Sequence, residues 1–364
     1  MIEGLETLLV AEKHPGTAEL HALIAGLLDA TRSTGRLVQT ERLSRARVYR
    51  ARFHVNGRAR SLIVKRLPPY RSERECAAVR RWLPRAGLDA HAPPLLGVAA
   101  QRNGALFWHV YEDLGPYPLA GAIDDPLRVV AAIDVIAKVH VGFARHPLLA
   151  ECRLAGGELG AAFFEASLRD ACRNIEAVQR AVNVDARGCK AAAGLCERLA
   201  NMVKQQPERM KLLRERGGPE TLLHGDLWTK NILAIPGSTG VHVRLIDWDH
   251  CGVGPVVYDL STFLRRFPLS QRPSVLDQYW TRLDSKHWPR PSLVDLNAML
   301  DTVELARCAN SITWRAVAIL NAEPDAAPEW AIADLEEIDT WFGELAPVLP
   351  VDDAPDNRME STAA

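Results

Sequence analysis

The most constraining feature of this sequence is a set of polar side chains carried by two otherwise apolar segments. Residues 222–233 read LLHGDLWTKNIL, and residues 241–247, VHVRLID, follow after the turn sequence PGSTG. The apolar positions predict two strands joined as a hairpin. Four polar residues would lie on its leading edge: His224, Asp226, Asn231 and Asp247. They form either a reactive site or a set of turn and capping residues, a role that Asp and Asn often fill.

The types of residue on this edge point to phosphate chemistry. Asp226 and Asn231 are five positions apart on a loop that enters a strand, and Asp247 returns to the same edge one hairpin later. Carboxylate and carboxamide oxygens are hard ligands that suit Mg²⁺, which keeps water and phosphate oxygens in its shell. A further carboxylate can orient or deprotonate a hydroxyl. The spacing favours phosphoryl transfer, and a metal-dependent hydrolase using His224, Asp226, Asp247 and His250 is the alternative.

Length and composition indicate a globular protein of two lobes or domains. The chain has 364 residues, 48% of them hydrophobic and 24% charged, which is too long for one small core. Its seven cysteines form no CxxC pair and no metal-ligand spacing, so we expect reduced thiols and a cytoplasmic location. Charge is uneven: residues 32–85 are strongly basic and the end of the chain is acidic. We expect neither a nucleic-acid nor a membrane partner.

The first third of the chain predicts a small α+β unit. Residues 17–30 have the periodicity of a helix with Thr17 as N-cap, and VYRARFHV (48–55) alternates as a half-buried strand. Asn56-Gly57 predicts a tight hairpin turn into SLIVKRL (61–67), which carries Lys65. A helix is predicted over 72–83, starting at Ser72, and a buried strand over 105–115. An ammonium in an apolar strand needs an anion or water, so Lys65 is a candidate binding residue.

From Pro126 onward the sequence predicts mainly helices. One covers 127–144, and two or three cover 158–216 with breaks around 184–185 and 206–207. More helices follow the 231–247 hairpin and continue to about residue 345. We therefore predict four parts: an N-terminal helical extension (1–30), an N-lobe (31–115), a C-lobe (116–347) and an acidic, disordered tail (348–364).

The order His-x-Asp-x4-Asn in HGDLWTKN matches the catalytic loop of protein kinases. Together with LIDWDHCGVGPVVYDLSTFL (245–264), this motif resembles those of the aminoglycoside phosphotransferase and choline-kinase-like family. The resemblance covers about residues 40–345. The resemblance implies a bilobal, protein-kinase-like α+β fold with a small β-rich N-lobe and a larger, mainly helical C-lobe. It also implies an ATP-dependent O-phosphotransferase that uses Mg²⁺ and a small hydroxyl-bearing substrate, with GTP left open as the donor.

The resemblance assigns a role to each matching position. Asp226 would be the catalytic aspartate, and Asn231 and Asp247 the Mg²⁺ ligands. Lys65 would reach the nucleotide phosphates, steadied by Glu75, which we prefer to Glu73 because it lies one turn inside its helix. The remaining assignments are a hinge at 111–114 that meets the base through Glu112 and Leu114, a structural His224, a bracing Asp259, and Asp249 as either an outer metal contact or a loop cap.

Two features limit what the resemblance implies. The segment LSRARVYR (43–50), where the phosphate-covering loop is expected, has no glycine, so Ser44 and Arg45 are the candidates to replace it. Acidic residues near the C-terminus would suit an amino sugar or amino alcohol: Glu329, Asp334, Glu336, Glu337 and Asp339. A nucleotide-binding pseudokinase that acts as a scaffold is the other alternative. A pseudokinase usually lacks at least one residue of the nucleotide-binding and catalytic set. All four members of that set are present here: Lys65, Asp226, Asn231 and Asp247. The acceptor and the oligomeric state are left open.

Overall fold

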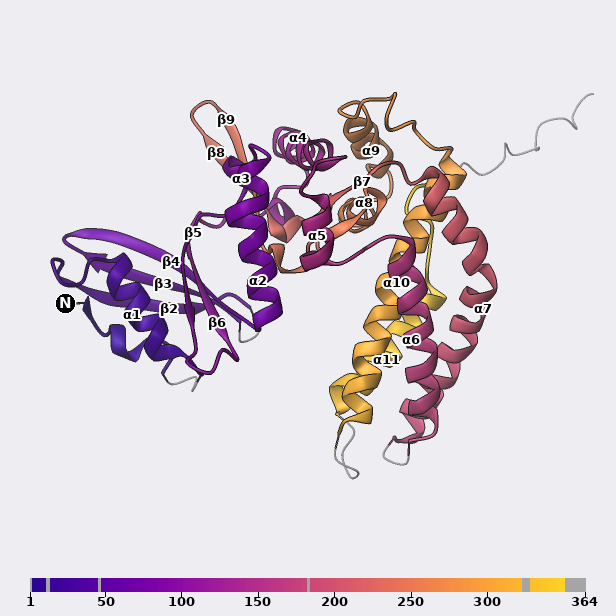
Figure 1. Cartoon of the computed structure of the whole chain (residues 1–364), viewed down its shortest axis with the longest axis horizontal. Helices are drawn as coiled ribbons and strands as arrows, with labels where there is room; N and C mark the ends of the chain where they lie inside the picture. Colours follow the sequence, from indigo (N-terminus) through magenta and orange to yellow (C-terminus); the bar gives the residue numbers. More distant parts are fainter. Residues whose placement is uncertain (1, 11–13, 45–46, 182–183, 323–327, 351–364) are drawn as a thin grey trace, which may run out of the picture. The chain divides into compact units, whose positions relative to one another are not determined.

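A computed structural model describes residues 2–10, 14–44, 47–181, 184–322 and 328–350 (Figure 1). The chain divides into two compact units, which are described separately. The first comprises Met1–Gly157 and His224–Gly252, and the second comprises Glu158–Leu223 and Val253–Ala364. Within the described ranges, no helix combines the length and the apolar character needed to cross a membrane.

A six-stranded sheet forms one side of the first unit (Figure 1). Its strands, in spatial order, are β1 (Ile2–Glu3), β2 (Gly35–Arg42), β3 (Val48–Val55), β4 (Arg58–Leu67), β6 (Phe107–Glu112) and β5 (Leu95–Ala100). β1 pairs with β2 in parallel, and the other neighbours are antiparallel. Alternate side chains of β3 are buried, as the sequence pattern predicted. Asn56 and Gly57 join β3 to β4 with φ of +48° and +77°, so the predicted tight turn is confirmed.

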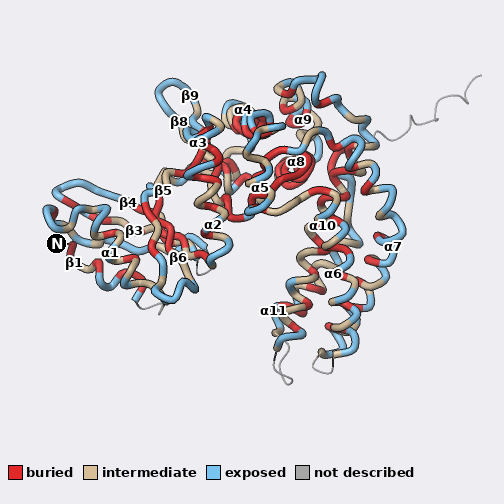
Figure 2. Tube along the Cα trace, in the orientation of Figure 1, coloured by how far each residue is buried: buried red, intermediate tan, exposed pale blue. Residues whose placement is uncertain are grey.

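The N-terminal segment contributes to the core of this sheet. Ile2, Leu5 and Leu8, together with Leu20 and Ile24 of α1 (Thr17–Leu27), are buried in one cluster with β3 and β4 (Figure 2). The predicted helix is present, but Thr17 is its first residue and not its cap. The cap is Gly16, whose φ of +78° suits a residue without a Cβ.

In the first unit, α2 (Pro69–Ala77) lies between β4 and β5 in the chain, and α4 (Pro126–Phe143) and α5 (Leu149–Gly156) follow the last strand of the sheet. The predicted start of α2 at Ser72 is wrong by three residues. Proline fits the first position of a helix because the N–H it lacks would have no helical partner there. α2 continues as a π-helical turn over Ala78–Trp82 and a short helix, α3 (Leu83–Arg85). The predicted helix over 127–144 is confirmed as α4, which Asp125 caps through the N–H of Leu127 at 3.0 Å.

The second hairpin of the first unit carries the polar residues found in the sequence. β8 (Ile232–Gly237) pairs with β9 (Gly240–Leu245), and Ile232 is directly opposite Leu245. The predicted hairpin is therefore confirmed. Asn231 directly precedes β8 and Asp247 lies two residues after β9, so both are just beyond the open end of the hairpin.

The second unit is mainly helical (Figure 1). Its helices are α6 (Ala161–Gln179), α7 (Ala186–Arg216), α8 (Val257–Leu264), α9 (Arg272–Trp280), α10 (Leu293–Leu320) and α11 (Glu329–Gly343). Apolar side chains of α6, α7, α10 and α11 form one buried cluster. A two-stranded sheet pairs β7 (Glu220–Leu223) with β10 (Gly252–Pro255), whose first residue is counted with the other unit.

Two predictions about the second unit differ from the structure: a helix break at 206–207 and the start of the tail. The break at 206–207 is wrong, because α7 continues through Pro207. Proline removes the donor to the carbonyl of residue 203, and Val203 lies on the exposed side of the helix, where water can replace that donor. Val348 and Leu349, assigned to the tail, are buried, and Arg272 donates to the Val348 carbonyl at 2.9 Å. Residues 351–364 lie outside the described residues.

Candidate active site

Lys65 and Glu75 form a buried ion pair in the first unit. Lys65 comes from β4 and Glu75 from α2, and Nζ lies 2.7 Å from Oε2. Their residues are only 7% and 1% exposed. Glu73, the alternative partner, is exposed on the same helix. Because an uncompensated charge in such a position is costly, the pairing accounts for a lysine in an apolar strand.

Asp247 completes the charge cluster from the far end of β9. Its Oδ1 lies 2.5 Å from the Lys65 ammonium, although the two residues are 182 positions apart. Burial opposes ionisation of Asp247, but Lys65 outweighs it and holds the pKa of the carboxyl well below its ordinary value. Burial likewise tends to lower the pKa of Lys65, and Glu75 and Asp247 raise it instead. Both groups are therefore charged at neutral pH.

Asp249 lies beside this cluster and is also buried. Its Oδ2 accepts from Nη1 of Arg71 at 3.3 Å and lies 3.7 Å from Lys65 Nζ. Its Oδ1 is buried and accepts no hydrogen bond from the described part of the chain; His250 Nε2 is 3.6 Å away. Burial, which is the largest effect, raises the pKa of Asp249. Arg71 was not predicted as a site residue. The only indication in the sequence is its place in the first turn of α2, two residues after Pro69.

The loop from His224 to Asn231 is tied to the strand that ends at Asp247. His224 Nε2 hydrogen-bonds the carbonyl oxygen of Ile246 at 2.8 Å, and its ring packs on Trp248 with centroids 4.7 Å apart. The N–H of Ile246 donates to the carbonyl of Asn231 at 2.9 Å. These bonds hold Asn231 next to the residue that precedes Asp247. His224 is buried, as a scaffold residue would be.

Asp226 and Asn231 contact each other within this loop. Nδ2 of Asn231 donates to the carbonyl oxygen of Asp226 at 2.8 Å and to its Oδ2 at 3.1 Å. The carboxamide is thereby oriented with its nitrogen toward Asp226, which leaves Oδ1 for another partner. Asp226 is partly exposed, so its carboxylate can be reached by a ligand.

Gly225 makes the tight path of this loop possible. Its φ is +81°, and an added Cβ would lie 2.0 Å from the carbonyl oxygen of His250. We therefore expect Gly225→Ala to lower the free energy of unfolding by more than about 3 kcal/mol, since it adds a backbone clash to an unfavourable φ. Gly57→Ala is the matched control, because Gly57 has φ +77° with nothing within 4 Å, and should cost about 1 kcal/mol. Equal losses in chemical denaturation would contradict this account of Gly225.

Asn231, Asp247 and Asp249 offer oxygen donors for a cation. Within the described ranges, no three His, Cys, Asp or Glu side chains are grouped so as to hold a metal by themselves. Mg²⁺ is usually held by one or two side chains and by substrate phosphates, so oxygens from Asn231 and Asp247 would suffice to hold it. The donors are oxygens, and the buried, unpaired Oδ1 of Asp249 adds another. The donor set therefore fits the predicted ion.

The other predicted site residues lie in several places. Ser44 is exposed in the turn between β2 and β3, and Arg45 lies outside the described residues. Glu112 ends β6, with its N–H donating to the Pro94 carbonyl at 3.1 Å, and Leu114 lies two residues beyond the strand, in irregular structure. Asp259 is fully buried in α8 of the second unit. Its bracing role toward the 224–231 loop stays a prediction.

Asp113, in the predicted hinge, was missed in the sequence. Its carboxylate accepts from Nε of Arg50 at 2.7 Å, from Oγ of Ser61 at 2.6 Å and from the N–H of Gly115 at 3.0 Å. Burial would raise the pKa of Asp113, but these hydrogen bonds lower it. The hinge segment is thus anchored to β3 and β4. The sequence contains one indication of this contact. The alternation of β3 places Arg50 on the polar face of the strand, where it can take an acidic partner.

A second missed group adjoins Glu75. His109 in β6 is fully buried and hydrogen-bonds the Tyr111 hydroxyl through Nδ1 at 2.9 Å and Ser72 Oγ through Nε2 at 2.7 Å. Burial, with the positive charges of Lys65 and Arg80, lowers the pKa of His109 from its ordinary 6.5 to about 3. The imidazole is therefore neutral at physiological pH.

This histidine predicts a pH dependence of stability. The unfolded chain binds a proton at this side chain near pH 6.5, whereas the folded chain does so only near pH 3. Stability should therefore be lost as the pH falls through this window, by roughly 3–6 kcal/mol from His109 alone. Denaturation measured between pH 7 and pH 4 should show a shallower loss in His109→Gln than in wild type. His54→Gln, at an exposed position of β3, should keep the wild-type slope, and a His109 variant that also kept it would refute the assignment.

The acidic residues expected to select an amine are mostly paired with arginines of the same unit. Arg187 lies 2.6 Å from Glu329 and 3.7 Å from Glu336, Arg315 lies 2.9 Å from Asp334, and Arg198 lies 2.6 Å from Asp339. Glu337 is exposed. These carboxylates connect α11 with α7 and α10, so they do not constitute an uncompensated acidic patch.

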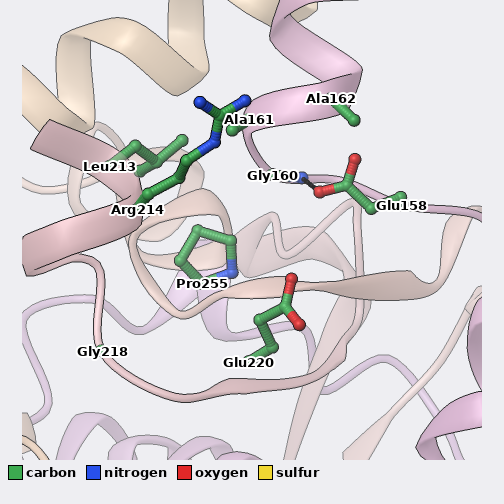
Figure 3. Close-up of a pocket in the computed structure, with 9 residues that line it drawn as sticks. All are labelled: Glu158, Gly160, Ala161, Ala162, Leu213, Arg214, Gly218, Glu220 and Pro255. Carbon is green, nitrogen blue, oxygen red and sulfur yellow. Dashed lines mark hydrogen bonds between the residues drawn. The ribbon is translucent and has the colours of Figure 1, made fainter. Parts of the chain in front are cut away.

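A cavity of about 320 Å³ lies in the second unit between the start of α6, the end of α7 and the β7–β10 sheet (Figure 3). Glu158, on its wall, accepts from the N–H groups of Gly160 at 2.9 Å and Phe163 at 3.0 Å, so its carboxylate caps α6. Arg214 and Glu220 bring both signs of charge to the lining. The cavity is large enough for a small polar molecule and has no preference for one sign of charge.

Comparison with known proteins gives one family and several similar folds. The family model described as "Phosphotransferase enzyme family" matches residues 45–294. No curated protein matches the chain. The GDP complex of wild-type aminoglycoside 2′-phosphotransferase-IIIa has a TM-score of 0.56 and 14% identity, covering 90% of this chain and 98% of that one.

Two further solved structures have the same architecture. The ethanolamine kinase of Plasmodium vivax has a TM-score of 0.55 and 11% identity, with 84% of this chain and 82% of that chain covered. Spectinomycin phosphotransferase, in complex with ADP and spectinomycin, has a TM-score of 0.51 and 12% identity, with 90% and 94% covered. At these identities the likeness concerns the fold, and it confirms the predicted α+β class with a sheet-bearing N-terminal part and a helical C-terminal part.

Proposed function

The chain belongs to the phosphotransferase enzyme family, and we propose that it is an ATP-dependent kinase that phosphorylates a hydroxyl of a small molecule. Membership confirms the resemblance found in the 222–264 segment and makes the chain a small-molecule phosphotransferase. The donor nucleotide, the metal, the acceptor and the role of each residue belong to the proposal.

The observation that carries the proposal is the cluster of Lys65, Glu75 and Asp247. Carboxylate oxygens of two residues, Glu75 in α2 and Asp247 just after β9, lie within 2.7 Å of the ammonium nitrogen of Lys65 in β4. Glu75 orients Lys65 from inside the fold, and Lys65 presents its charge at the partly exposed Asp247. An ammonium held in this way can neutralise phosphate oxygens of a nucleotide without having to be ordered first.

Asp226 is proposed as the residue that receives the acceptor hydroxyl. Its Oδ2 is held by Nδ2 of Asn231 at 3.1 Å, which orients the carboxylate. The other oxygen, Oδ1, would accept the hydrogen bond from the substrate hydroxyl and take its proton as the substrate oxygen bonds to the γ-phosphorus of ATP. The bond from that phosphorus to the bridging oxygen would break in the same step, and ADP would leave with that oxygen. His224 is proposed to hold this loop through Ile246 rather than to act as a base, because its Nε2 is already engaged.

Asn231 and Asp247 are proposed to hold Mg²⁺ through Oδ1 and a carboxylate oxygen respectively. When bound, the ion would offset the negative charge of the nucleotide phosphates. Asp249 is proposed as a support, because its Oδ2 accepts from Arg71 at 3.3 Å and lies 3.7 Å from Nζ of Lys65. Ser44, in the β2–β3 turn, and the hinge at Glu112 and Leu114 remain the proposed contacts to phosphate and base.

The two alternatives are less well supported. A hydrolase would use His250, but its side chain is 45% exposed and points to Asp249 at 3.6 Å, and this function gives Lys65 and Glu75 no role. A scaffold that only binds nucleotide would not require Asp226 and Asn231 to be held in contact.

The acceptor is proposed to be a small polyol or amino alcohol. The similar structures are named for ethanolamine, aminoglycosides and spectinomycin, which all carry hydroxyl and amino groups. The pairing of the α11 carboxylates with arginines argues against selection of an amine by that helix.

The test is Mg²⁺-dependent turnover of ATP and GTP against a panel of amino sugars, amino alcohols, sugars and nucleosides. Turnover stimulated by one class, with phosphate recovered on that compound, would support the proposal and define the acceptor. Metal-dependent hydrolysis of a substrate in the absence of any nucleotide would favour the hydrolase, and nucleotide binding without any turnover would favour the scaffold. Failure to bind either nucleotide would refute the kinase.

A further inference from the structure

One face of the six-stranded sheet carries a polar cluster beside the proposed nucleotide site. The side chains of β3 and β4 that enter the core alternate with a second set, so that set lies on the opposite face. Arg50, Ser61 and Lys65 belong to this second set. In the register of the sheet, Arg50 is opposite Ile63 of β4, two positions before Lys65, and opposite Glu41 of β2 on its other side. Arg50 therefore lies on the face that also carries the Lys65 ammonium.

The guanidinium of Arg50 contacts carboxylates from two different elements. Its Nε and Nη2 donate to Oδ2 and Oδ1 of Asp113 at 2.7 and 3.3 Å, and its Nη1 donates to Oε2 of Glu41 at 3.2 Å. Asp113 directly follows β6 in the proposed hinge, and Glu41 is the last residue but one of β2. All three nitrogens of one planar group are engaged, so this group joins the hinge to the end of β2.

Asp113 is also fixed by two uncharged donors. Its Oδ2 accepts from Oγ of Ser61 at 2.6 Å, and its Oδ1 accepts from the N–H of Gly115 at 3.0 Å. Each carboxylate oxygen thus has two donors, which fills its capacity, so Asp113 is occupied by its own chain. The side chains of Arg50 and Asp113 are only 12% and 9% exposed, and their ion pair is therefore screened less by water than one on the surface.

We propose that Arg50 is a positioning residue that fixes the hinge and the end of β2 relative to each other. It thereby sets the spacing between the contacts to the base and the contacts to the phosphates. The proposal rests on the proposed kinase function, which assigns the hinge to the base and the β2–β3 turn to the phosphates. Lysine cannot replace Arg50 in this role, because its compact ammonium does not span two carboxylates as the planar guanidinium does.

The first test measures the order of the hinge and needs no enzymatic activity. Exchange of the Gly115 amide hydrogen is followed by NMR in wild type and in two variants. Arg50→Met should raise the exchange rate at least about tenfold, because Asp113 loses two charged hydrogen bonds and holds this N–H less firmly. Arg52→Met is the matched control, since Arg52 lies on the same face of β3 and contacts Glu41 at 3.1 Å, with no bond to Asp113 in the described chain. An unchanged rate in Arg50→Met, or equal rises in both variants, would overturn the proposal.

The second test measures nucleotide binding and turnover. Arg50→Lys should raise the Kd and the KM of the nucleotide about three- to tenfold with kcat unchanged, because apparent affinity falls with the fraction of molecules that hold both contacts in place. Glu41→Gln weakens only the contact to β2, and it should raise the nucleotide KM in the same way by a smaller factor. Arg52→Lys should keep the wild-type constants.

The split between KM and kcat separates positioning from a loss of folded protein, which would lower kcat and leave KM unchanged. A fall in kcat at constant nucleotide KM, or an unchanged KM in Glu41→Gln, would overturn the proposal. If Arg50→Lys does not fold, Glu41→Gln still decides, because Glu41 is half-buried at the end of a strand. Failure of wild type to bind ATP or GTP would instead refute the kinase, and the Gly115 exchange rates would still show whether Arg50 holds the hinge.

Discussion

Asp226→Asn is expected to lower kcat by about 10²–10⁴ while leaving nucleotide binding and the free energy of unfolding nearly unchanged. The substitution keeps the shape of the side chain, and the amide oxygen can still accept from Nδ2 of Asn231, as Oδ2 does at 3.1 Å. It removes the negative charge that would receive the hydroxyl proton. Turnover, nucleotide binding by calorimetry and chemical denaturation would be measured on the same preparation.

A control for this variant is Asp170→Asn, at a partly exposed position of α6 whose carboxylate lies 3.6 Å from Arg169. It should retain wild-type kcat. If Asp226→Asn kept more than about a tenth of the wild-type kcat, Asp226 would not be the proton acceptor, since such groups contribute at least about a hundredfold.

Lys65→Met is expected to damage both stability and turnover. It leaves Glu75, which is 1% exposed, without its cation, and breaking a buried pair from one side costs about 3–5 kcal/mol. Nucleotide-dependent turnover should fall by at least about 10², because the charge facing the phosphates is removed. Thermal or chemical denaturation and steady-state kinetics would measure the two effects separately.

The double variant Lys65→Met/Glu75→Gln separates the two effects. Replacing both charges removes the unpaired carboxylate, so most of the stability should return while turnover stays low. Lys204→Met, at an exposed position of α7, is the control for loss of one positive charge and should behave as wild type. Recovery of turnover in the double variant would show that Lys65 supports the fold and not the reaction.

Several parts of the fold could be predicted because their cause is local. The alternation of VYRARFHV, the turn residues Asn56 and Gly57, and the apolar 127–144 helix depend on neighbouring positions, and the structure has each of them. Predictions failed where a local preference was outweighed. The helix α7 passes through Pro207 because packing along its length is worth more than one missing hydrogen bond.

The sequence alone identifies the residues of the 224–231 loop as one group, since the His-x-Asp-x4-Asn spacing keeps them together in any fold. It also favoured Glu75 over Glu73, from one turn of helical periodicity, and the structure pairs Glu75 with Lys65. Tertiary packing, by contrast, brings Lys65 to Asp247, 182 positions away, and places Ser72 of α2 against His109 of β6. These contacts join separate elements, and hydrogen bonds between such elements depend on how their faces pack, which no spacing along the chain records.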